Sequence, residues 1–278
     1  MKTLRIPRLW RAPGMLFGLA LSVLLVVVAI FALQLAPFPP LEQHAADMLR
    51  PPGTVYALGS DLMGRDVLSR LMRGATNSLR VAALAVALAA SLGTLVGLIA
   101  GYAGGWLDVI LMRLADLLFA FPPLLLALAI VSALGAGAEN AVLAIGIVYT
   151  PIFARVARAP TLLVKTREYV TAARAQGVSV WRILWRHILP NIAAPIIVQI
   201  SLALAWAILL EASLSYLGLG TKPPEPSWGA MLSESRRDME YAPWLAITPG
   251  AAIMLAVLGF NMLGDGLRDA LDPQMRNT

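Results

Sequence analysis

The sequence predicts an all-α integral membrane protein with six transmembrane helices. Of its 278 residues, 59% are hydrophobic and 14% are charged, whereas a soluble domain is closer to half apolar and a quarter charged. The mean hydropathy is +0.74. The chain also has long windows without Asp, Glu, Lys or Arg, and a bilayer-spanning helix needs about 20 apolar residues. These observations argue against a large soluble core.

Six windows of the chain lack these four residue types, and each is a candidate span. The windows are 12–41, 81–107, 117–138, 140–154, 187–210 and 241–264. Five of these windows are long enough by themselves to span a bilayer. The window 140–154 is shorter, but Glu139 can lie at one membrane interface while the Arg155 side chain snorkels to the other. The predicted helices cover residues 14–36, 78–101, 109–133, 139–158, 193–217 and 244–265.

Basic residues before the first span raise the alternative of a cleaved signal peptide. They are Lys2, Arg5, Arg8 and Arg11. The apolar run that follows, residues 15–36, is longer than the roughly 7–15 residues of a signal-peptide core. We therefore expect an uncleaved first span.

The distribution of positive charge predicts which side of the membrane is cytoplasmic. An excess of Lys and Arg marks cytoplasmic loops. With the N-terminus inside, the inner segments hold 14 of the 22 Lys and Arg residues and the outer segments hold the other 8. Six spans then place both the N- and the C-terminus in the cytoplasm. Because this topology explains the net charge of +6, no nucleic-acid partner is predicted.

The two longer outer segments are predicted to differ in structure. In the first, residues 37–77, Ser60 and Asp61 are helix-capping residue types, and apolar residues recur on one helical face over 61–73. This pattern predicts an amphipathic helix at the membrane surface. The second segment, 218–243, contains KPPEPSW and is predicted to be an ordered loop, because proline interrupts helices.

Gly93, Gly97 and Gly101 recur at four-residue intervals in the second predicted span. Small residues at this spacing let membrane helices approach closely, so we expect a helix-packing surface here. The alternative is chance recurrence in a chain rich in glycine and alanine.

Ionisable residues in the predicted spans lie near span ends. Asp108, Arg113 and Asp116 lie at the inner end of the third span, where Arg113 and Asp116 have the spacing of an ion pair on one helical face. Glu211 lies near the outer end of the fifth span. Ionisable groups within a membrane are functional candidates, but near span ends a structural role is an equal alternative.

Residue patterns of common catalytic and metal sites are missing from the sequence. The absence of cysteine excludes thiol nucleophiles and cysteine metal ligands. No GxxxxGKS/T, HExxH or GxSxG occurs, so hydrolysis of ATP by a P-loop is not expected. The only histidines, His44 and His187, fall on opposite sides of the predicted membrane. We therefore predict no catalytic residue, no metal and no cofactor bound by this chain.

The segment between the fourth and fifth spans, residues 159–192, lies in the cytoplasm in this topology. Glu168–Gln176 favours a helix, and Gly177 ends or caps it. Apolar residues over 179–188 predict a second amphipathic helix, which ends at Pro190. Two short helices in an elbow are suited to docking into a groove of a partner protein. The alternative is a solvated basic loop that follows the charge rule.

This cytoplasmic segment resembles a known motif. Ala172, Ala173, Gly177, Leu189 and Pro190 match the pattern of the EAA loop in permease subunits of bacterial ABC importers. Three other segments narrow the resemblance to the dipeptide, oligopeptide and nickel permease subfamily, and to its C-type subunits. They are GSDLMGRDVLSRLMRGATNSL (59–79), EASLSYLGLGTKPPEPSWGAML (211–232) and FNMLGDGLRDALDP (260–273).

The resemblance implies the MetI-like fold of a type I ABC importer transmembrane domain. Residues 1–77 would form a cytoplasmic tail, the first span and an outer segment. Residues 78–278 would form a permease core of five spans with the coupling loop 159–192. The chain would be a transport subunit and not an enzyme, in a bacterial cytoplasmic (inner) membrane.

Partners and substrates also follow from the resemblance. It implies a homologous second permease subunit, two cytoplasmic ATPases that bind ATP and Mg²⁺, and an extracytoplasmic solute-binding protein. Dipeptides or oligopeptides are the implied substrates, with nickel, a nickel chelate, glutathione or another small solute as alternatives. No substrate-binding residue is predicted.

One position departs from the EAA motif. Thr171 stands where the motif has glutamate, which removes the carboxylate that would contact the ATPase. Glu168, one turn earlier, is a candidate substitute. We expect packing of Ala172, Ala173 and Gly177 to contribute more to docking than an ion pair.

Two other classes of function are less consistent with the sequence. A secondary transporter that works alone needs ionisable groups near the bilayer midplane and often has inverted repeats. Here the charges lie at span ends, and no convincing repeat is found. A membrane-embedded hydrolase would need nucleophile and base motifs, which are absent.

Overall fold

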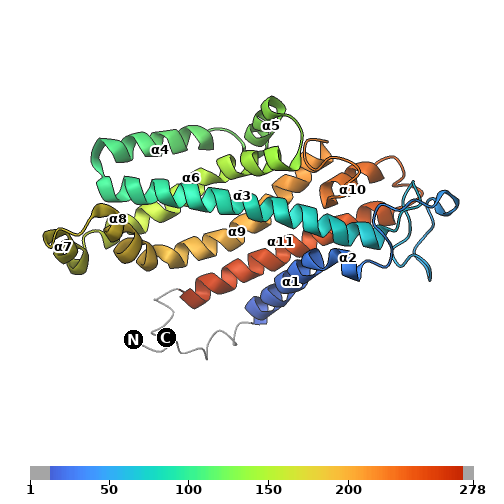
Figure 1. The fold of residues 1–278 in the computed structure, drawn as a ribbon, viewed down its shortest axis with the longest axis horizontal. Helices are drawn as coiled ribbons and strands as arrows, with labels where there is room; N and C mark the ends of the chain where they lie inside the picture. Colours follow the sequence, from blue (N-terminus) through green and yellow to red (C-terminus); the bar gives the residue numbers. More distant parts are fainter. Residues whose placement is uncertain (1–12, 272–278) are drawn as a thin grey trace.

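The computed structural model describes residues 13–271, and these residues are helical apart from connecting loops (Figure 1). The helices are α1 (Pro13–Ile30), α2 (Ala32–Leu35), α3 (Val67–Ala103), α4 (Gly105–Phe119), α5 (Pro123–Leu134), α6 (Ala138–Val164), α7 (Glu168–Ala175), α8 (Val180–Ile183), α9 (Leu189–Tyr216), α10 (Trp228–Ser235) and α11 (Trp244–Leu271). A 3₁₀ turn, η2 (Ala45–Asp47), and a π-helical turn, η3 (Leu184–Ile188), complete the described elements. The all-α prediction is confirmed.

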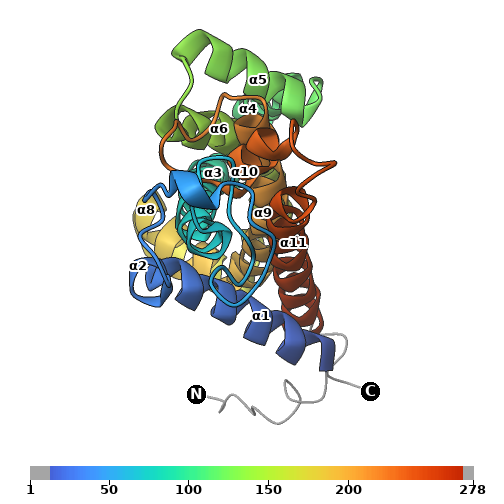
Figure 2. The same ribbon diagram turned by 90° about the vertical axis from the view of Figure 1, so that its right-hand side faces the viewer.

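The core of the molecule lies where α3, α6 and α9 pack together. Its centre is rich in alanine, and Ala82, Ala85 and Ala89 of α3 and Ala141 and Ala144 of α6 are fully buried. Short side chains allow helix backbones to approach closely, which stabilises helix pairs where lipid removes most of the hydrophobic driving force. Figure 2 shows α1 and α5 on opposite edges of this bundle.

Four helical stretches are long and apolar enough to cross a membrane. They are α3, α6, α11 and the continuous helix Val180–Tyr216, which joins α8, η3 and α9 over 37 residues. The predicted third span is a bent pair instead of one straight helix. Helices α4 and α5 meet at an angle of 91°, because Pro122 and Pro123 lack the N–H groups that would continue α4.

The predicted first span is shorter and less regular than the others. Helix α1 has 18 residues, or about 27 Å of helix, and the chain breaks at Phe31 before the four residues of α2. By length and composition, the described residues thus contain four candidate spans, or five if the bent pair counts as one. The count of six depends on α1 and stays a prediction.

The prediction of a separate surface helix over residues 61–73 is wrong. The helix begins at Val67, because the Asp66 carboxylate accepts a hydrogen bond from the Ser69 N–H (2.8 Å) and caps it. It then continues as α3 without a break to Ala103. The apolar face packs against the protein, since Val67 is buried with Met231.

The prediction that residues 218–243 form only a loop also needs correction. The segment contains α10, whose first turn is capped by the Ser227 hydroxyl accepting from the Ala230 N–H (3.2 Å). Trp228 is buried, and its indole N–H donates to the Leu71 carbonyl (3.1 Å). This contact with α3 stabilises a helix too short to persist alone.

Helices α7 and α8 lie at one end of the molecule, and α10 with the loop after α2 lies at the other (Figure 1). The start of α1 adjoins the end of α11, since a Cβ added at Gly266 would meet Met15. Residue 77, the predicted end of the N-terminal part, lies within α3, so this helix belongs to both parts.

Candidate functional site

Helix α7 follows α6 closely, and local chemistry explains both of its ends. Glu168 lies in its first turn and Arg174 in its last, and each charge interacts favourably with the helix dipole. The helix ends where Gly177 adopts φ = +76°, a conformation that glycine takes without steric cost. The Gly177 N–H donates to the Arg174 carbonyl (3.0 Å), and the Val178 N–H donates to that of Ala173 (3.1 Å).

Helices α7 and α8, the turn η3 and the first residues of α9 form an elbow, defined here as residues 168–190. One face of the elbow is buried against three long helices. An apolar cluster contains Val170 and Ala173 of α7, Ile183 of α8, Leu184 and Ile188 of η3, Leu98 of α3, Ala157 of α6, and Ile192 and Ile196 of α9. Because close-packed side chains transmit displacement, a movement of α7 would reach α3, α6 and α9 together.

Polar contacts also attach the elbow to the C-terminal end of α3. The Lys165 ammonium, just before α7, donates to the carbonyls of Gly101 (2.7 Å) and Tyr102 (3.3 Å). At the other end of α7, the Arg174 guanidinium lies 5.2 Å from the centre of the Tyr102 ring, within the range of a cation–π contact. Both ends of α7 are therefore held to the same turn of α3.

The predicted docking residues of α7 divide between its two faces. Glu168, Thr171, Ala172 and Gly177 are exposed, whereas Ala173 is buried in the elbow's own core. The Thr171 hydroxyl donates to the carbonyl of Arg167 (3.3 Å), so it is satisfied within the helix. A partner on the outer face would thus meet Ala172 and Gly177, while Ala173 supports them from below.

Leu189 and Pro190 form the first turn of α9. Leu189 is half-buried and Pro190 is exposed. Within the continuous helix Val180–Tyr216, Pro190 lacks the N–H that would continue the helical hydrogen bonds. The turn η3 directly before them is a π-helix, a feature that often occurs at functional sites.

Gly93, Gly97 and Gly101 lie on the face of α3 that packs against α6. A Cβ added at these positions would meet, in order, the carbonyl oxygen of Thr150, the carbonyl oxygen of Ala154 and the Cβ of Thr161. The backbones of the two helices therefore approach too closely for any side chain at these sites.

Ion pairs join α4 to α6 near the elbow. Asp108 accepts two hydrogen bonds from Arg158, from Nε (2.6 Å) and Nη2 (2.7 Å). Asp116 is held by Arg155 at 2.6 Å. The predicted pair of Arg113 and Asp116 exists only as an exposed contact at 3.9 Å. Sequence spacing could not identify Arg155 as the stronger partner, because it lies on another helix.

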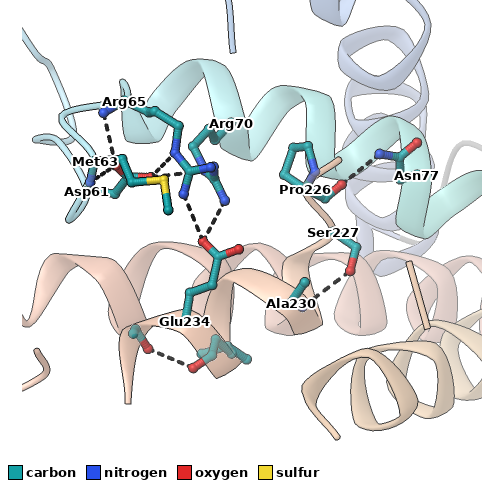
Figure 3. Close-up of polar contacts among 11 residues, drawn as sticks. Asp61, Met63, Arg65, Arg70, Asn77, Pro226, Ser227, Ala230 and Glu234 are labelled. Atoms are coloured by element: carbon teal, nitrogen blue, oxygen red, sulfur yellow. Dashed lines mark hydrogen bonds and ion pairs between the residues drawn. The ribbon is translucent and has the colours of Figure 1, made fainter. Parts of the chain in front are cut away.

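The opposite end of the molecule carries a second polar cluster, which sequence reasoning missed. We call residues 36–66 together with 217–243 the outer cap, because the topology predicted from the sequence places them outside the membrane. Glu234 of α10 accepts hydrogen bonds through Oε2 from Arg70 Nη2 (2.6 Å) and Arg65 Nη2 (3.2 Å), and Arg65 Nε donates to Asp61 (2.6 Å) (Figure 3). Only the i, i+4 spacing of Asp61 and Arg65 could have been read from the sequence.

A neighbouring set of contacts holds the loop before α10. Arg73 Nε donates to Glu225 (2.9 Å). Asn77 Nδ2 donates to the Pro226 carbonyl (2.7 Å) (Figure 3). The hydrogen bond from the Arg73 guanidinium holds the pKa of the Glu225 carboxyl below its usual range. These contacts fix the outer cap to the outer turns of α3.

Glu211 is almost completely buried, at 1% exposure, near the C-terminal end of α9. Its Oε1 accepts a hydrogen bond from the Ser215 hydroxyl (2.6 Å). The next residue, Ala212, touches α10, because a Cβ at Gly229 would meet the Ala212 backbone. Glu211 therefore lies where α9 supports the outer cap.

The two histidines are far apart, His44 just before η2 and His187 within η3. Among residues 13–271, no group of three or more His, Asp or Glu side chains is arranged to hold a metal ion.

Comparison with known proteins adds to this geometry. Residues 93–277 match the family model described as "Binding-protein-dependent transport system inner membrane component". The chain is 47% identical over 260 residues to the dipeptide transport system permease protein DppC of Alkalihalophilus pseudofirmus, covering 94% of this chain and 86% of the relative. It is 46% identical over 255 residues to the glutathione transport system permease protein GsiD of Pectobacterium atrosepticum, covering 91% and 85%.

Among solved structures, the chain resembles one described as inward-facing conformations of the MetNI methionine ABC transporter. The TM-score is 0.57 and the identity 16%, and the match covers 73% of this chain and 96% of that one. The resemblance shows a shared, MetI-like fold.

Proposed function

Since the chain belongs to the family of binding-protein-dependent transport system inner membrane components, we infer that it forms half of the translocation pathway of an ATP-driven importer. A homologous second permease subunit would form the other half. Two cytoplasmic ATPases would bind and hydrolyse ATP, and an extracytoplasmic solute-binding protein would deliver the substrate. This chain contributes no catalytic group.

The observation that carries this proposal is the construction of the elbow. Its outer face presents Thr171, Ala172 and Gly177 on a slim surface, with Glu168 one turn away. Its inner face belongs to one apolar cluster with α3, α6 and α9. A short helix that is exposed on one side and packed on the other is suited to passing a partner's movement to the membrane helices.

The proposed cycle follows from this connection. ATP binding closes the pair of ATPases, and each ATPase carries its docked elbow toward the other. The cluster beneath the elbow tilts α3, α6 and α9 together, which opens the pathway to the outside and admits the substrate from the binding protein. Hydrolysis and separation of the ATPases return the pathway to face the cytoplasm.

Short peptides are the proposed substrates. The two relatives are named for dipeptide and glutathione transport, and glutathione is itself a tripeptide. A dipeptide or oligopeptide is the first choice, glutathione the second, and nickel, a nickel chelate or another small solute the remaining alternatives. The proposed location is a bacterial inner membrane, with the elbow and both termini in the cytoplasm.

The test uses the whole importer, purified and reconstituted into liposomes. Ala172→Arg places a bulky charge on the exposed face of α7. Ala57→Arg is the matched control, because Ala57 is an exposed alanine in the outer cap, away from the elbow. Only Ala172→Arg should reduce co-purification of the ATPases and abolish uptake of short peptides.

Other outcomes of this experiment would contradict specific parts of the proposal. Full uptake and full ATPase activity in Ala172→Arg would contradict the proposal that the exposed face of α7 docks on an ATPase. Uptake of glutathione or Ni²⁺ in preference to dipeptides would change the substrate. Uptake by the chain without any ATPase would favour a secondary transporter.

A further inference from the structure

The Glu211 side chain is enclosed by hydroxyl groups from three parts of the chain. Ser215 lies one turn later on α9, Ser78 lies on α3, and Ser227 caps α10, and the hydroxyls of all three lie around the Glu211 carboxyl group. Each of these four residues is at most 2% exposed. Glu211 is therefore part of a closed polar site between α9, α3 and the outer cap.

The two oxygens of this carboxyl group have different surroundings. Oε1 accepts the hydrogen bond from the Ser215 hydroxyl (2.6 Å), whereas Oε2 is buried and has no hydrogen-bond partner among the described residues. The hydroxyl oxygens of Ser78 and Ser227 already accept from the backbone N–H groups of Trp228 (3.2 Å) and Ala230 (3.2 Å). Each hydroxyl oxygen keeps a second lone pair, so an O–H group on Oε2 has acceptors within its own site.

No positive charge balances Glu211. Among residues 13–271, no ion pair includes it, and the side chains that act on its carboxyl group are all serines. A buried charge without a partner is strongly unfavourable, and such a group becomes neutral instead. A water molecule could complete the hydrogen bonds of Oε2 but would not remove the charge, whereas a proton does both.

Charged groups on the elements around Glu211 are engaged elsewhere or exposed. In the outer cap, Glu225 pairs with Arg73 and Glu234 pairs with Arg70. Helix α5 carries no charged residue, and those of α11 begin at Asp265, near its C-terminal end. The exposed charged residues of α3, α6 and the outer cap include Arg80, Glu139, Lys222, Arg236 and Arg237.

We propose that Glu211 is a proton-binding site, in which Oε2 carries the proton and donates to the hydroxyl oxygen of Ser78 or Ser227, while Oε1 accepts from Ser215. The neutral carboxyl group then joins α9 to α3 and to the outer cap without burying a charge. The import cycle needs no such proton, so this inference goes beyond the proposed function and does not depend on it.

Infrared spectroscopy of the full chain in liposomes tests the proposal directly, because a neutral carboxyl group has a C=O stretching band that a carboxylate lacks. At pH 7 the parent should show this band, and Glu211→Gln should lack it. Glu240→Gln is the matched control, because Glu240 is an exposed residue of the outer cap, and it should keep the band.

A second variant keeps this test decisive if Glu211→Gln does not fold. Ser215→Ala removes the hydrogen bond that Oε1 accepts. Because a hydrogen bond to a C=O group lowers its stretching frequency, the band of Glu211 should remain in Ser215→Ala and move to higher frequency.

Thermal unfolding across a pH series gives an independent measurement. Above the unfolded glutamate pKa of about 4.3, folding must take up a proton that the unfolded chain does not hold, so the parent loses stability as the pH rises. Glu211→Gln is neutral at every pH and lacks this loss. Its melting temperature should therefore exceed that of the parent by an amount that grows with pH, while Glu240→Gln follows the parent.

Two results would overturn this inference. One is an infrared spectrum whose neutral-carboxyl region is unchanged by both Glu211→Gln and Ser215→Ala. The other is a melting temperature that rises with added Na⁺ or K⁺ at constant ionic strength in the parent but not in Glu211→Gln. The carboxylate would then be ionised and neutralised by a metal cation instead of a proton.

Discussion

At Gly97 the helix pair α3–α6 leaves room for a hydrogen atom and nothing larger. A Cβ there would meet the Ala154 carbonyl oxygen and lie 2.8 Å from the Ala157 Cβ. Backbone atoms cannot rotate away as a side chain can, so a larger residue must separate the helices. The same argument applies to Gly93 and Gly101.

Gly97→Leu should therefore destabilise the chain strongly. Overpacking against backbone predicts a loss of roughly 3 kcal/mol or more. Gly250→Leu is the matched control, because a Cβ at Gly250 in α11 has no atom within 4 Å, and its stability should stay within about 0.5 kcal/mol of the parent. Thermal unfolding of both variants in one detergent measures the difference. Equal melting temperatures would contradict the close α3–α6 packing.

Glycine spacing made these contacts predictable at the level of single residues, since three small residues four apart define one helical face. The separate roles of Ala172 and Ala173 were not predictable in the same way. Both are small, and both match the same motif. Only the position of α7 against Leu98 and Ala157 shows that Ala173 faces inward.

Helix α10 depends on contacts with distant parts of the chain. It has eight residues, and isolated helices of this length are not stable in water. Ser227 caps its start, Trp228 packs on α3, and Glu234 pairs with Arg70. The preceding loop is held by Arg73 through Glu225.

The contact of Glu225 with Arg73 makes the stability of the outer cap depend on pH. The folded pKa of Glu225 is lowered, mainly by the hydrogen bond from Arg73. Its contribution is therefore present above the unfolded pKa of about 4.3 and is lost as the pH falls through the folded value. Because both side chains are partly exposed, the contribution is about 0.5 kcal/mol.

Glu225→Gln should therefore be slightly less stable than the parent at pH 7, and the difference should shrink as the pH falls below the unfolded pKa of about 4.3. Unfolding of the two chains across this pH range is the measurement. Arg113→Gln, which changes a mostly exposed side chain, should show no such dependence. A difference between parent and Glu225→Gln that grows toward low pH would reverse the sign of the argument.

Three elements were mispredicted, each for a different reason. The FPP sequence at 121–123 is a helix-breaking signal, but the apolar window around it suggested one straight span. The prolines at 223, 224 and 226 suggested a loop throughout 218–243, yet they end just before α10. The amphipathic pattern over 61–73 was real, but the apolar face packs on protein and not on the membrane surface.

For the whole molecule, the membrane class was predictable because a bilayer imposes a minimum length and polarity on each span. The arrangement of the helices was not predictable from hydropathy. Apolar residues that face lipid and apolar residues that face a neighbouring helix are alike in sequence. The contacts of α3 with α6 and the edge positions of α1 and α5 therefore required the structure.

The orientation of the whole chain can be tested by labelling single cysteines, since the parent has none. Thr54 lies in the outer cap and Thr171 in the elbow, and both are exposed. In intact cells, a membrane-impermeant maleimide should label Thr54→Cys after access to the outer face, and Thr171→Cys only after permeabilisation. The reverse pattern would invert the predicted topology.

The helix from Val180 to Tyr216 is unbroken. A small rotation at one of its ends therefore becomes a large displacement at the other. Its 37 residues extend for about 55 Å, from the elbow to just beyond Ala212, which touches Gly229 of α10. A rotation of about 10° around one end would displace the other by roughly 10 Å at this length. A tilt of that size at the elbow end would therefore move the end beside α10 by about the diameter of a helix.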